Sequence, residues 1–298
     1  MKKVIKAALW LFLSLALLII IVIFETNDWP VGSSIAGLLA GLTIPCIITS
    51  IEDVFDDSDW KESQRKYERG KFFRKEDKIR LSFSYLFRIK IDNEYFLVRN
   101  ARGTGKYQPV GGVYKMTSSE AVVLRQKYSA SDDDKIPIDE SSKLDYRIWV
   151  PDRFLRKFVR RFDRTNDREQ LENLSREFKE ELIDTGLVHF SHLNYRYCGR
   201  HFEKIQFSQH FQCYELLMAD ILEVELDTEQ ETELKRLKNK SSEQYLFATA
   251  EQINSLGIKA GTDQLQEIIA DHTAKILQEK TQELIRTSDY KKTFEVTL

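Results

Sequence analysis

The sequence predicts a two-helix transmembrane hairpin at the N-terminus, followed by a cytosolic α/β domain. Two runs without charged residues, 7–24 and 31–51, stand near the start of the 298-residue chain. Each is long enough to cross a hydrocarbon core about 30 Å thick as a helix. Beyond them, strand-like segments alternate with segments of helical periodicity, as in an α/β domain. We therefore expect a hairpin at 1–51, a charged membrane-proximal linker at 52–78 and a folded domain at 79–298.

Charge and cysteine content exclude two classes of protein. The formal net charge is −2 although 31% of the residues are charged, so the chain has no overall positive field with which to attract DNA. Cys46, Cys198 and Cys213 show neither paired nor metal-like spacing, which fits a reducing compartment. We therefore expect no DNA partner and no disulfide-stabilised fold.

The basic residues beside the two apolar runs predict how the hairpin crosses the membrane. Lys2, Lys3 and Lys6 precede the first run. Lysine and arginine recur at 61–75 after the second run, whereas the connection at 25–30 carries only acidic charge. The positive-inside rule therefore places both termini in the cytosol. A cleaved signal peptide is the alternative for the first run, but no small-residue cleavage motif follows it and a second span comes immediately.

The second apolar run carries small residues four positions apart, at Ser33, Gly37 and Gly41. This small-xxx-small pattern lets helix backbones approach closely within a membrane. Pro45 follows and can kink the helix beyond that face. Two interpretations are open: the face packs the two helices of one hairpin together, or it joins hairpins of different subunits.

The first part of the folded domain has the pattern of strands joined by tight turns. Aromatic and β-branched residues dominate 79–91 and 95–99, and the polar residues between them predict a hairpin. A further strand segment follows at 107–114 and contains Gly111 and Gly112. The backbone of such a pair can turn sharply and approach a ligand closely, so we expect a ligand-binding loop there.

The remainder of the domain alternates between helices and strands. A polar stretch at 115–145 leads into a strand at 145–149 and an amphipathic helix at 151–162. The basic face of this helix suits phosphate groups or anionic lipid, although a solvated face is the simpler explanation. Beyond the acidic segment described next, the expected elements are strands at 192–204 and 206–218, a charged helix or loop at 228–242, a strand running into a helix at 245–256, and a helix at 262–281.

An acidic helix at 167–186 is the most informative part of the sequence. Its apolar residues recur at the spacing of one buried helix face, at Leu171, Leu174, Phe178 and Leu182. Glu177, Glu180 and Glu181 lie outside this face on neighbouring turns, where like charges repel one another unless a cation lies between them. Carboxylate oxygens suit Mg²⁺ or Mn²⁺. A solvated acidic face balanced by basic neighbours is the alternative.

The order of these elements and the motif within 176–181 resemble the Nudix superfamily. The core of its sequence box, R-E-U-x-E-E with U apolar, is matched by Arg176, Glu177, Phe178, Glu180 and Glu181, and the segment 107–112 resembles the P-G-G that precedes the box. The resemblance implies an α/β/α sandwich with a mixed sheet. It also implies that Glu177, Glu180 and Glu181 bind Mg²⁺, with Glu180 and Glu181 catalytic. Glu172, four residues before Arg176, is then expected to orient it through a helical ion pair.

Three departures from the box bear on activity. Arg168 stands where the box has its first glutamate, with Glu169 beside it. The glycine expected at the position of Ile183 comes instead at Gly186. About forty-five extra residues separate the glycine pair from the helix, far more than an ordinary loop. Metal binding tolerates such changes, whereas hydrolysis needs attack geometry held to fractions of an ångström. A Mg²⁺-dependent hydrolase activity is therefore left open.

A membrane hairpin fused to a divergent Nudix domain resembles the SMODS-associated Nudix proteins of bacterial cyclic-oligonucleotide antiphage systems (CBASS). The resemblance implies a multi-pass effector in the bacterial inner membrane. Its cytosolic domain would sense a cyclic oligonucleotide, assemble as a homo-oligomer and drive disruption of the membrane. Two alternatives fit the same residues: a membrane-anchored Nudix hydrolase that cleaves a nucleoside diphosphate derivative, and a scaffold that needs neither cleft nor metal.

Overall fold

The chain forms two compact units, Met1–Ser63 and Gln64–Leu298. The computed structural model describes residues 2–55, 60–100, 104–136, 142–258, 267–277, 284–285, 287 and 289–298. The first unit holds the predicted membrane hairpin and the second holds the α/β domain. Within the expected linker, helix α3 (Trp60–Arg69) begins in the first unit and ends in the second.

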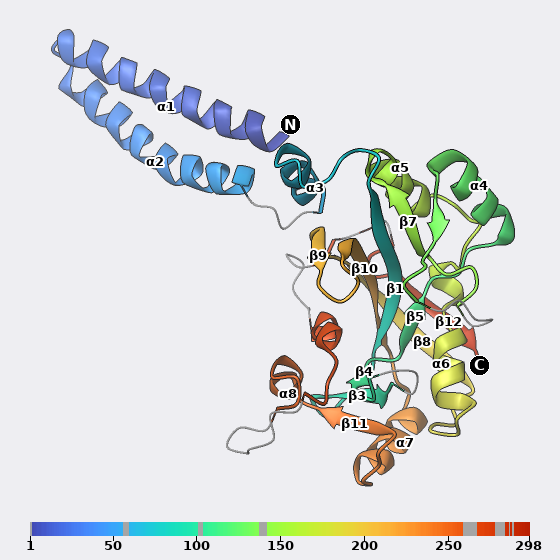
Figure 1. The fold of residues 1–298 in the computed structure, drawn as a ribbon. Helices are drawn as coiled ribbons and strands as arrows, with labels where there is room; N and C mark the ends of the chain where they lie inside the picture. The colour runs from blue at the N-terminus through green and yellow to red at the C-terminus, as the bar shows by residue number, and fades with distance from the viewer. Residues whose placement is uncertain are drawn as a thin grey trace. The chain divides into compact units, whose positions relative to one another are not determined.

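Two long apolar helices form the first unit (Figure 1). α1 (Lys2–Thr26) and α2 (Pro30–Phe55) pack side by side in antiparallel directions. Pro30 occupies the first position of α2, where its missing N–H costs no helical hydrogen bond. The stretches Ile5–Thr26 and Pro30–Ile51 are long and apolar enough to cross a membrane. The two predicted helices are therefore confirmed.

The glycine face of α2 is not used in packing against α1. Ala36 and Thr43 are buried in the hairpin, at 4% and 5% exposure. By contrast, a Cβ atom added at Gly37 or Gly41 would meet no described atom within 4 Å. The face that carries Gly37 and Gly41 is therefore open, which argues against the interpretation that it serves packing within one hairpin.

An eight-stranded mixed sheet forms the centre of the second unit (Figure 1). Its strands run in the order β12-β8-β10-β1-β7-β6, with β5 paired to β1 and β9 paired to β10. The central pair β1 and β10 is parallel, and the other pairs are antiparallel. The strands are β1 (Lys78–Arg88), β5 (Gly111–Val113), β6 (Ser131–Asp132), β7 (Arg147–Pro151), β8 (His192–Phe202), β9 (Gln206–Ser208), β10 (Cys213–Val224) and β12 (Thr293–Thr297).

A smaller four-stranded sheet lies beside it. Its strands are β2 (Lys90–Ile91), β3 (Glu94–Arg99), β4 (Tyr107–Gln108) and β11 (Tyr245–Ala248). Asp92 and Asn93 join β2 to β3 with φ values of 48° and 67°, the left-handed pair that a two-residue hairpin turn requires. The predicted hairpin is confirmed, but the strand expected at 79–91 is divided between the two sheets.

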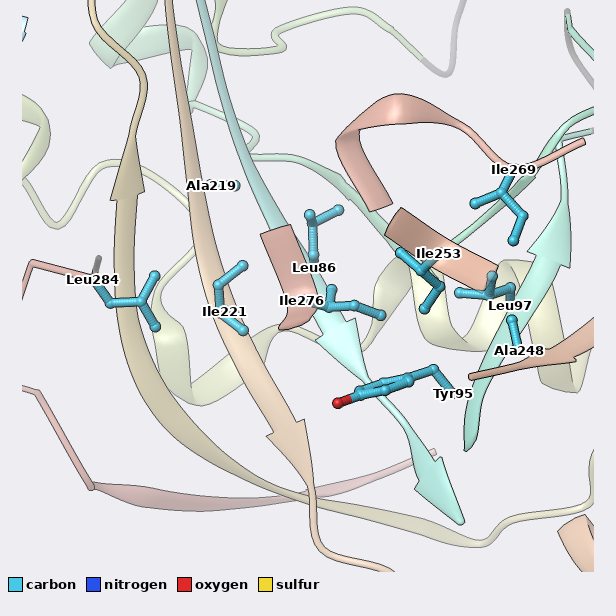
Figure 2. Packing of buried hydrophobic residues seen from close by; sticks show 10 residues of the cluster. All are labelled: Leu86, Tyr95, Leu97, Ala219, Ile221, Ala248, Ile253, Ile269, Ile276 and Leu284. Atoms are coloured by element: carbon cyan, nitrogen blue, oxygen red, sulfur yellow. The ribbon is translucent and has the colours of Figure 1, made fainter. Parts of the chain in front are cut away.

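Helices cover both faces of the large sheet. The helices that follow α3 are α4 (Ser118–Tyr128), α5 (Asp152–Phe162), η1 (Leu171–Asn173), α6 (Arg176–Phe178), η2 (Lys179–Ile183), α7 (Thr228–Lys238), α8 (Ala250–Asn254) and η3 (Asp271–Leu277). On one face, Phe83 packs against Phe162 of α5 and Phe87 packs against Phe178 of α6, with ring centroids 4.9 and 5.6 Å apart. On the other face, Leu86 lies in a buried cluster with residues of α8, η3 and the small sheet (Figure 2). Because successive residues of a strand point to opposite faces, β1 contributes to both layers, and the expected α/β/α arrangement is confirmed.

Three elements differ from the sequence expectation. α4 lies inside the stretch expected to be polar and irregular, and its N-cap Thr117 accepts a hydrogen bond from the backbone N–H of Glu120. β12 adds the weakly patterned C-terminal tail to the edge of the large sheet beside β8. The helix expected at 262–281 is described only in part, and that part contains the 3₁₀ helix η3, whereas 262–266 and 278–281 lie outside the described residues.

Candidate functional site

The acidic segment is broken into two pieces instead of forming one helix. A 3₁₀ turn, η1, is followed by a break at Leu174 and Ser175, then by α6 and by the π-helical turn η2. The hydroxyl of Tyr195 donates to the carbonyl of Leu171 at 2.6 Å and accepts from the N–H of Leu174 at 3.2 Å. The prediction of a continuous helix is wrong because this buried side chain takes over backbone hydrogen bonds that a helix would make. The predicted apolar face nevertheless stays buried, at Leu171, Leu174, Phe178 and Leu182.

Arg176 holds the acidic segment against the edge of the large sheet. Its Nε atom pairs with Oε1 of Glu169 at 3.0 Å, and Nη1 pairs with Glu177. Its Nη2 atom donates to the carbonyl oxygen of Val113 in β5 at 3.2 Å. Burial, together with the carboxylates of Glu169 and Glu177, raises the pKa of the neighbouring Tyr85 hydroxyl far above its ordinary value, so that group stays protonated.

The partner of Arg176 differs from the one that spacing predicts. Glu172 is exposed and is not among the partners of Arg176, because the break at 174–175 removes the helical i,i+4 relation. Glu169 takes that role instead. Its other oxygen, Oε2, accepts from the N–H of Lys115 at 2.9 Å. Glu169 lies one residue after the position where the Nudix box has its first glutamate. The irregular backbone between them nevertheless lets its carboxylate pair with Arg176.

The two glycines of β5 are required by close approach on opposite sides of the strand. A Cβ atom at Gly111 would lie 2.3 Å from the carbonyl oxygen of Tyr85. A Cβ atom at Gly112 would lie 2.2 Å from Cγ and 2.3 Å from Oε1 of Glu177. Gly112 therefore makes room for the glutamate that Arg176 holds. The pair lies in strand β5, and the close approach that the structure shows is to the chain itself; contact of this pair with a ligand stays a prediction.

Alanine substitutions at these two glycines are expected to have different effects. Gly111→Ala overlaps a fixed backbone atom, so we expect thermal unfolding of the full chain in detergent to report a loss of about 1–3 kcal/mol. Gly112→Ala overlaps a flexible side chain, so we expect a smaller loss of stability but a displaced Glu177. A larger loss for Gly112→Ala than for Gly111→Ala would contradict this assignment.

The three glutamates of the motif are not arranged as a preformed metal site. The carboxylate of Glu177 is engaged by Arg176, and Glu180 is 46% exposed with its Oε2 atom 3.9 Å from the same guanidinium. Glu181 is half-buried in η2. Among the residues that the structure describes, no group of three or more His, Cys, Asp or Glu side chains is placed to hold a metal ion. As arranged, with Arg176 against Glu177 and beside Glu180, these side chains do not fit Mg²⁺ or Mn²⁺.

A cavity of about 530 Å³ opens on the face of the large sheet away from α6. Ser82 and Ser84 of β1 and the backbone of Gly111 and Gly112 line it, whereas Phe87, which packs against α6, points to the other face. Its volume lies in the range of pockets that bind small molecules. Ionisable side chains complete the lining: Arg147, His272, Lys275, Glu203, Glu215 and Asp271.

Most of the charges that line the cavity have partners. Lys275 Nζ lies 2.6 Å from Oε1 of Glu203, and Arg147 Nη1 lies 3.3 Å from Oδ2 of Asp145. The hydrogen bond from the adjacent His272 side chain lowers the pKa of Asp271 to about 2, so this carboxylate is ionised at neutral pH. The cavity therefore offers hydrogen-bond donors and acceptors together with cations that a phosphate can draw away from their carboxylates.

The fold and this site together define a Nudix-type domain, in which a glycine pair on a strand meets an arginine-held acidic segment. The chain belongs to the SMODS-associated NUDIX domain family, whose model matches residues 78–277. Searches of curated proteins and of solved structures returned no match. The chain therefore combines a SMODS-associated NUDIX domain with two N-terminal helices that could span a membrane.

The predicted site residues fall into separate groups. Arg176, Glu177 and Gly112 come together, whereas Ser33, Gly37 and Gly41 lie in the hairpin unit. Sequence reasoning missed Glu169 as the partner of Arg176 and missed the cations of the cavity, of which Lys275 is an example. No motif marks Lys275, because it reaches the cavity from η3, far along the chain from the glycine pair.

Proposed function

We propose that this protein is a membrane effector of a bacterial antiphage signalling system. Its cytosolic domain binds a cyclic oligonucleotide, ligand-bound subunits associate into a homo-oligomer, and the rearranged hairpins disrupt the inner membrane. The observation that carries this proposal is the combination, in one chain, of two helices able to cross a membrane and a SMODS-associated NUDIX domain that contains a ligand-sized cavity. The basic residues that flank the hairpin favour cytosolic termini.

Ligand binding without turnover is the mode that the site supports. The cavity is large enough for nucleotide units and lies beside Gly111 and Gly112, where backbone and ligand can come close. The carboxylates needed for Mg²⁺-dependent hydrolysis face a cation of the chain itself, because Arg176 pairs with Glu177 and lies 3.9 Å from Glu180. A ligand drives assembly only through a higher affinity for the assembled state, so the bound conformation must favour contacts between subunits.

The test measures binding and turnover on the same protein. The purified full chain in an uncharged detergent with Mg²⁺ is titrated by calorimetry with a panel of cyclic di- and trinucleotides and nucleoside diphosphate sugars, and each ligand is then recovered to detect cleavage. We expect one cyclic ligand to bind and to be recovered intact. Multiple turnover of a nucleoside diphosphate derivative, without binding of any cyclic ligand, would overturn the proposal in favour of an anchored hydrolase.

We further expect Lys275→Met to weaken binding of the tightest cyclic ligand by about tenfold, because one charge-assisted hydrogen bond to phosphate is lost. Lys235→Met is the matched control, since Lys235 also pairs with a glutamate, Glu231 at 3.4 Å, but lies on α7 outside the cavity. The double variant Glu180→Gln/Glu181→Gln is expected to keep its affinity. Equal weakening in the Lys275 and Lys235 variants would place the ligand elsewhere.

A further inference from the structure

A second hollow, of about 390 Å³, lies at the C-terminal end of α5. It is lined by Tyr128, Lys157, Arg160, Arg161, Arg164 and Thr165. α5 packs on Phe83 of β1, whereas the neighbouring residues Ser82 and Ser84 line the larger cavity. Because successive residues of a strand point to opposite faces, the two hollows lie on opposite sides of the large sheet and are separate sites.

The charge of this hollow is strongly positive and mostly uncompensated. Arg161 is neutralised by Glu120, to which its Nε atom donates at 2.8 Å. Lys157, Arg160 and Arg164 are exposed, and among the described residues none forms an ion pair or a side-chain hydrogen bond with them. The negative end of the α5 dipole stabilises cations in the last turn, but it does not explain why they surround a hollow.

The base of the hollow is rigid and can make specific contacts. Glu120 is fully buried, and its ion pair with Arg161 fixes one wall. Thr165 is also buried, and its hydroxyl lies 3.4 Å from Oε2 of Glu120. The ring of Tyr128 is held against Phe158, with centroids 6.3 Å apart. Held side chains of this kind lose little conformational freedom when a ligand binds.

We propose that this hollow, which we call the α5 basic pocket, binds a phosphate-bearing anion. Two guanidinium groups and one ammonium group converge on a single cavity, and guanidinium forks match phosphate oxygens geometrically. The cations are exposed and unpaired among the described residues, so a phosphate does not have to displace an internal carboxylate. The phosphate has two possible sources, a soluble phosphate compound or the headgroup of an anionic lipid, which share this chemistry.

The test compares two matched charge-removal variants of the full chain in an uncharged detergent. Arg160→Gln/Arg164→Gln removes two exposed cations from the α5 basic pocket. Arg236→Gln/Lys240→Gln removes two exposed cations from the region of α7, which have no ion-pair partner among the described residues and lie on a surface outside both hollows. Binding of inorganic pyrophosphate and of monomeric dihexanoyl phosphatidylglycerol is measured by calorimetry. All four positions are exposed, so both variants are expected to unfold at the temperature of the wild type.

We expect the pocket variant to weaken binding of at least one probe by about tenfold or more, with little change in the control. Loss of pyrophosphate binding alone identifies a soluble phosphate compound as the ligand, and loss of phosphatidylglycerol binding identifies a lipid headgroup. The single variant Lys157→Gln should weaken the same probe to a smaller extent. The proposal fails if neither probe binds the wild type, or if the pocket variant and the control weaken binding equally.

Discussion

Replacing Asp220 with alanine is expected to lower the free energy of unfolding by about 3–5 kcal/mol, because it leaves a buried guanidinium without its counter-charge. Asp220 is fully buried in β10. Its two oxygens accept from Nε and Nη2 of Arg200 at 2.8 and 2.9 Å, and from the hydroxyls of Tyr197 and Tyr114 at 2.8 and 2.7 Å. Four hydrogen bonds to one carboxylate join β10 to β8 and to the residue that follows β5.

Thermal unfolding of the full chain in detergent measures this effect, and Asp163→Ala is the matched control. Asp163 also pairs with Arg200, but its side chain is 44% exposed, so its loss is expected to cost at most about 1 kcal/mol. Equal losses in the free energy of unfolding for Asp220→Ala and Asp163→Ala would show that the buried hydrogen bonds of Asp220 do not stabilise the fold more than the exposed ion pair does.

The same carboxylate predicts how stability changes with acid. Burial alone would raise the pKa of Asp220, but Arg200 and the hydroxyls of Tyr114 and Tyr197 outweigh it, and the pKa is lowered below its ordinary value. Its stabilising contribution is therefore complete above the unfolded pKa of about 4 and is lost as pH falls through the lowered pKa. The stability difference between wild type and Asp220→Asn should accordingly shrink in acid.

Local sequence pattern predicted most of the fold because strands and amphipathic helices are specified by short-range periodicity. The two apolar N-terminal helices, the hairpin of β2 and β3, and α5 all follow from such patterns. α4 was missed because its residues are mostly polar, although Thr117 and Glu120 form a helix start signal. β12 was missed because an edge strand is stabilised by pairing with β8, which its own residues do not reveal.

The candidate site was predictable only where the motif is contiguous. The pattern from Arg176 to Glu181 identified the acidic segment, yet the break in the segment depends on Tyr195, which comes from a different strand. The partner of Arg176 follows from that break, so spacing pointed to Glu172 where the structure uses Glu169. Long-range side-chain insertion of this kind leaves no local signal in the sequence.

In the proposed function the hairpin links ligand binding to the membrane. The packing of the hairpin indicates which of its surfaces is available to a second subunit. The hairpin buries Ala36 and Thr43 and leaves Gly37 and Gly41 uncovered. In a membrane, helices associate through close packing at small residues because lipid provides no hydrophobic driving force. An uncovered small-residue face therefore suits association with the hairpin of a second subunit.

Under the proposed function, Gly37→Leu/Gly41→Leu is expected to abolish membrane disruption while leaving ligand binding by the NUDIX domain unchanged. Two leucine side chains on this face hold neighbouring backbones apart, and close contact at such a face is what brings membrane helices together. In vesicles that hold a fluorescent dye, the full-length variant should release less than about a tenth of the dye that wild type releases when the cyclic ligand is added. Calorimetry on the same preparation should give the wild-type affinity.

Leu38→Phe/Leu42→Phe is the matched control for this experiment. Leu38 and Leu42 have the same four-residue spacing and are 72% and 66% exposed, so the control adds bulk to an adjacent exposed apolar surface and leaves the glycine face intact. It should release dye as wild type does, since lipid can adjust around larger apolar side chains. Gly37→Ala/Gly41→Ala should keep part of the activity, because a methyl group enlarges the face only slightly. Full dye release from the leucine variant would mean that subunits associate through another surface, and that the glycine spacing has no role in assembly.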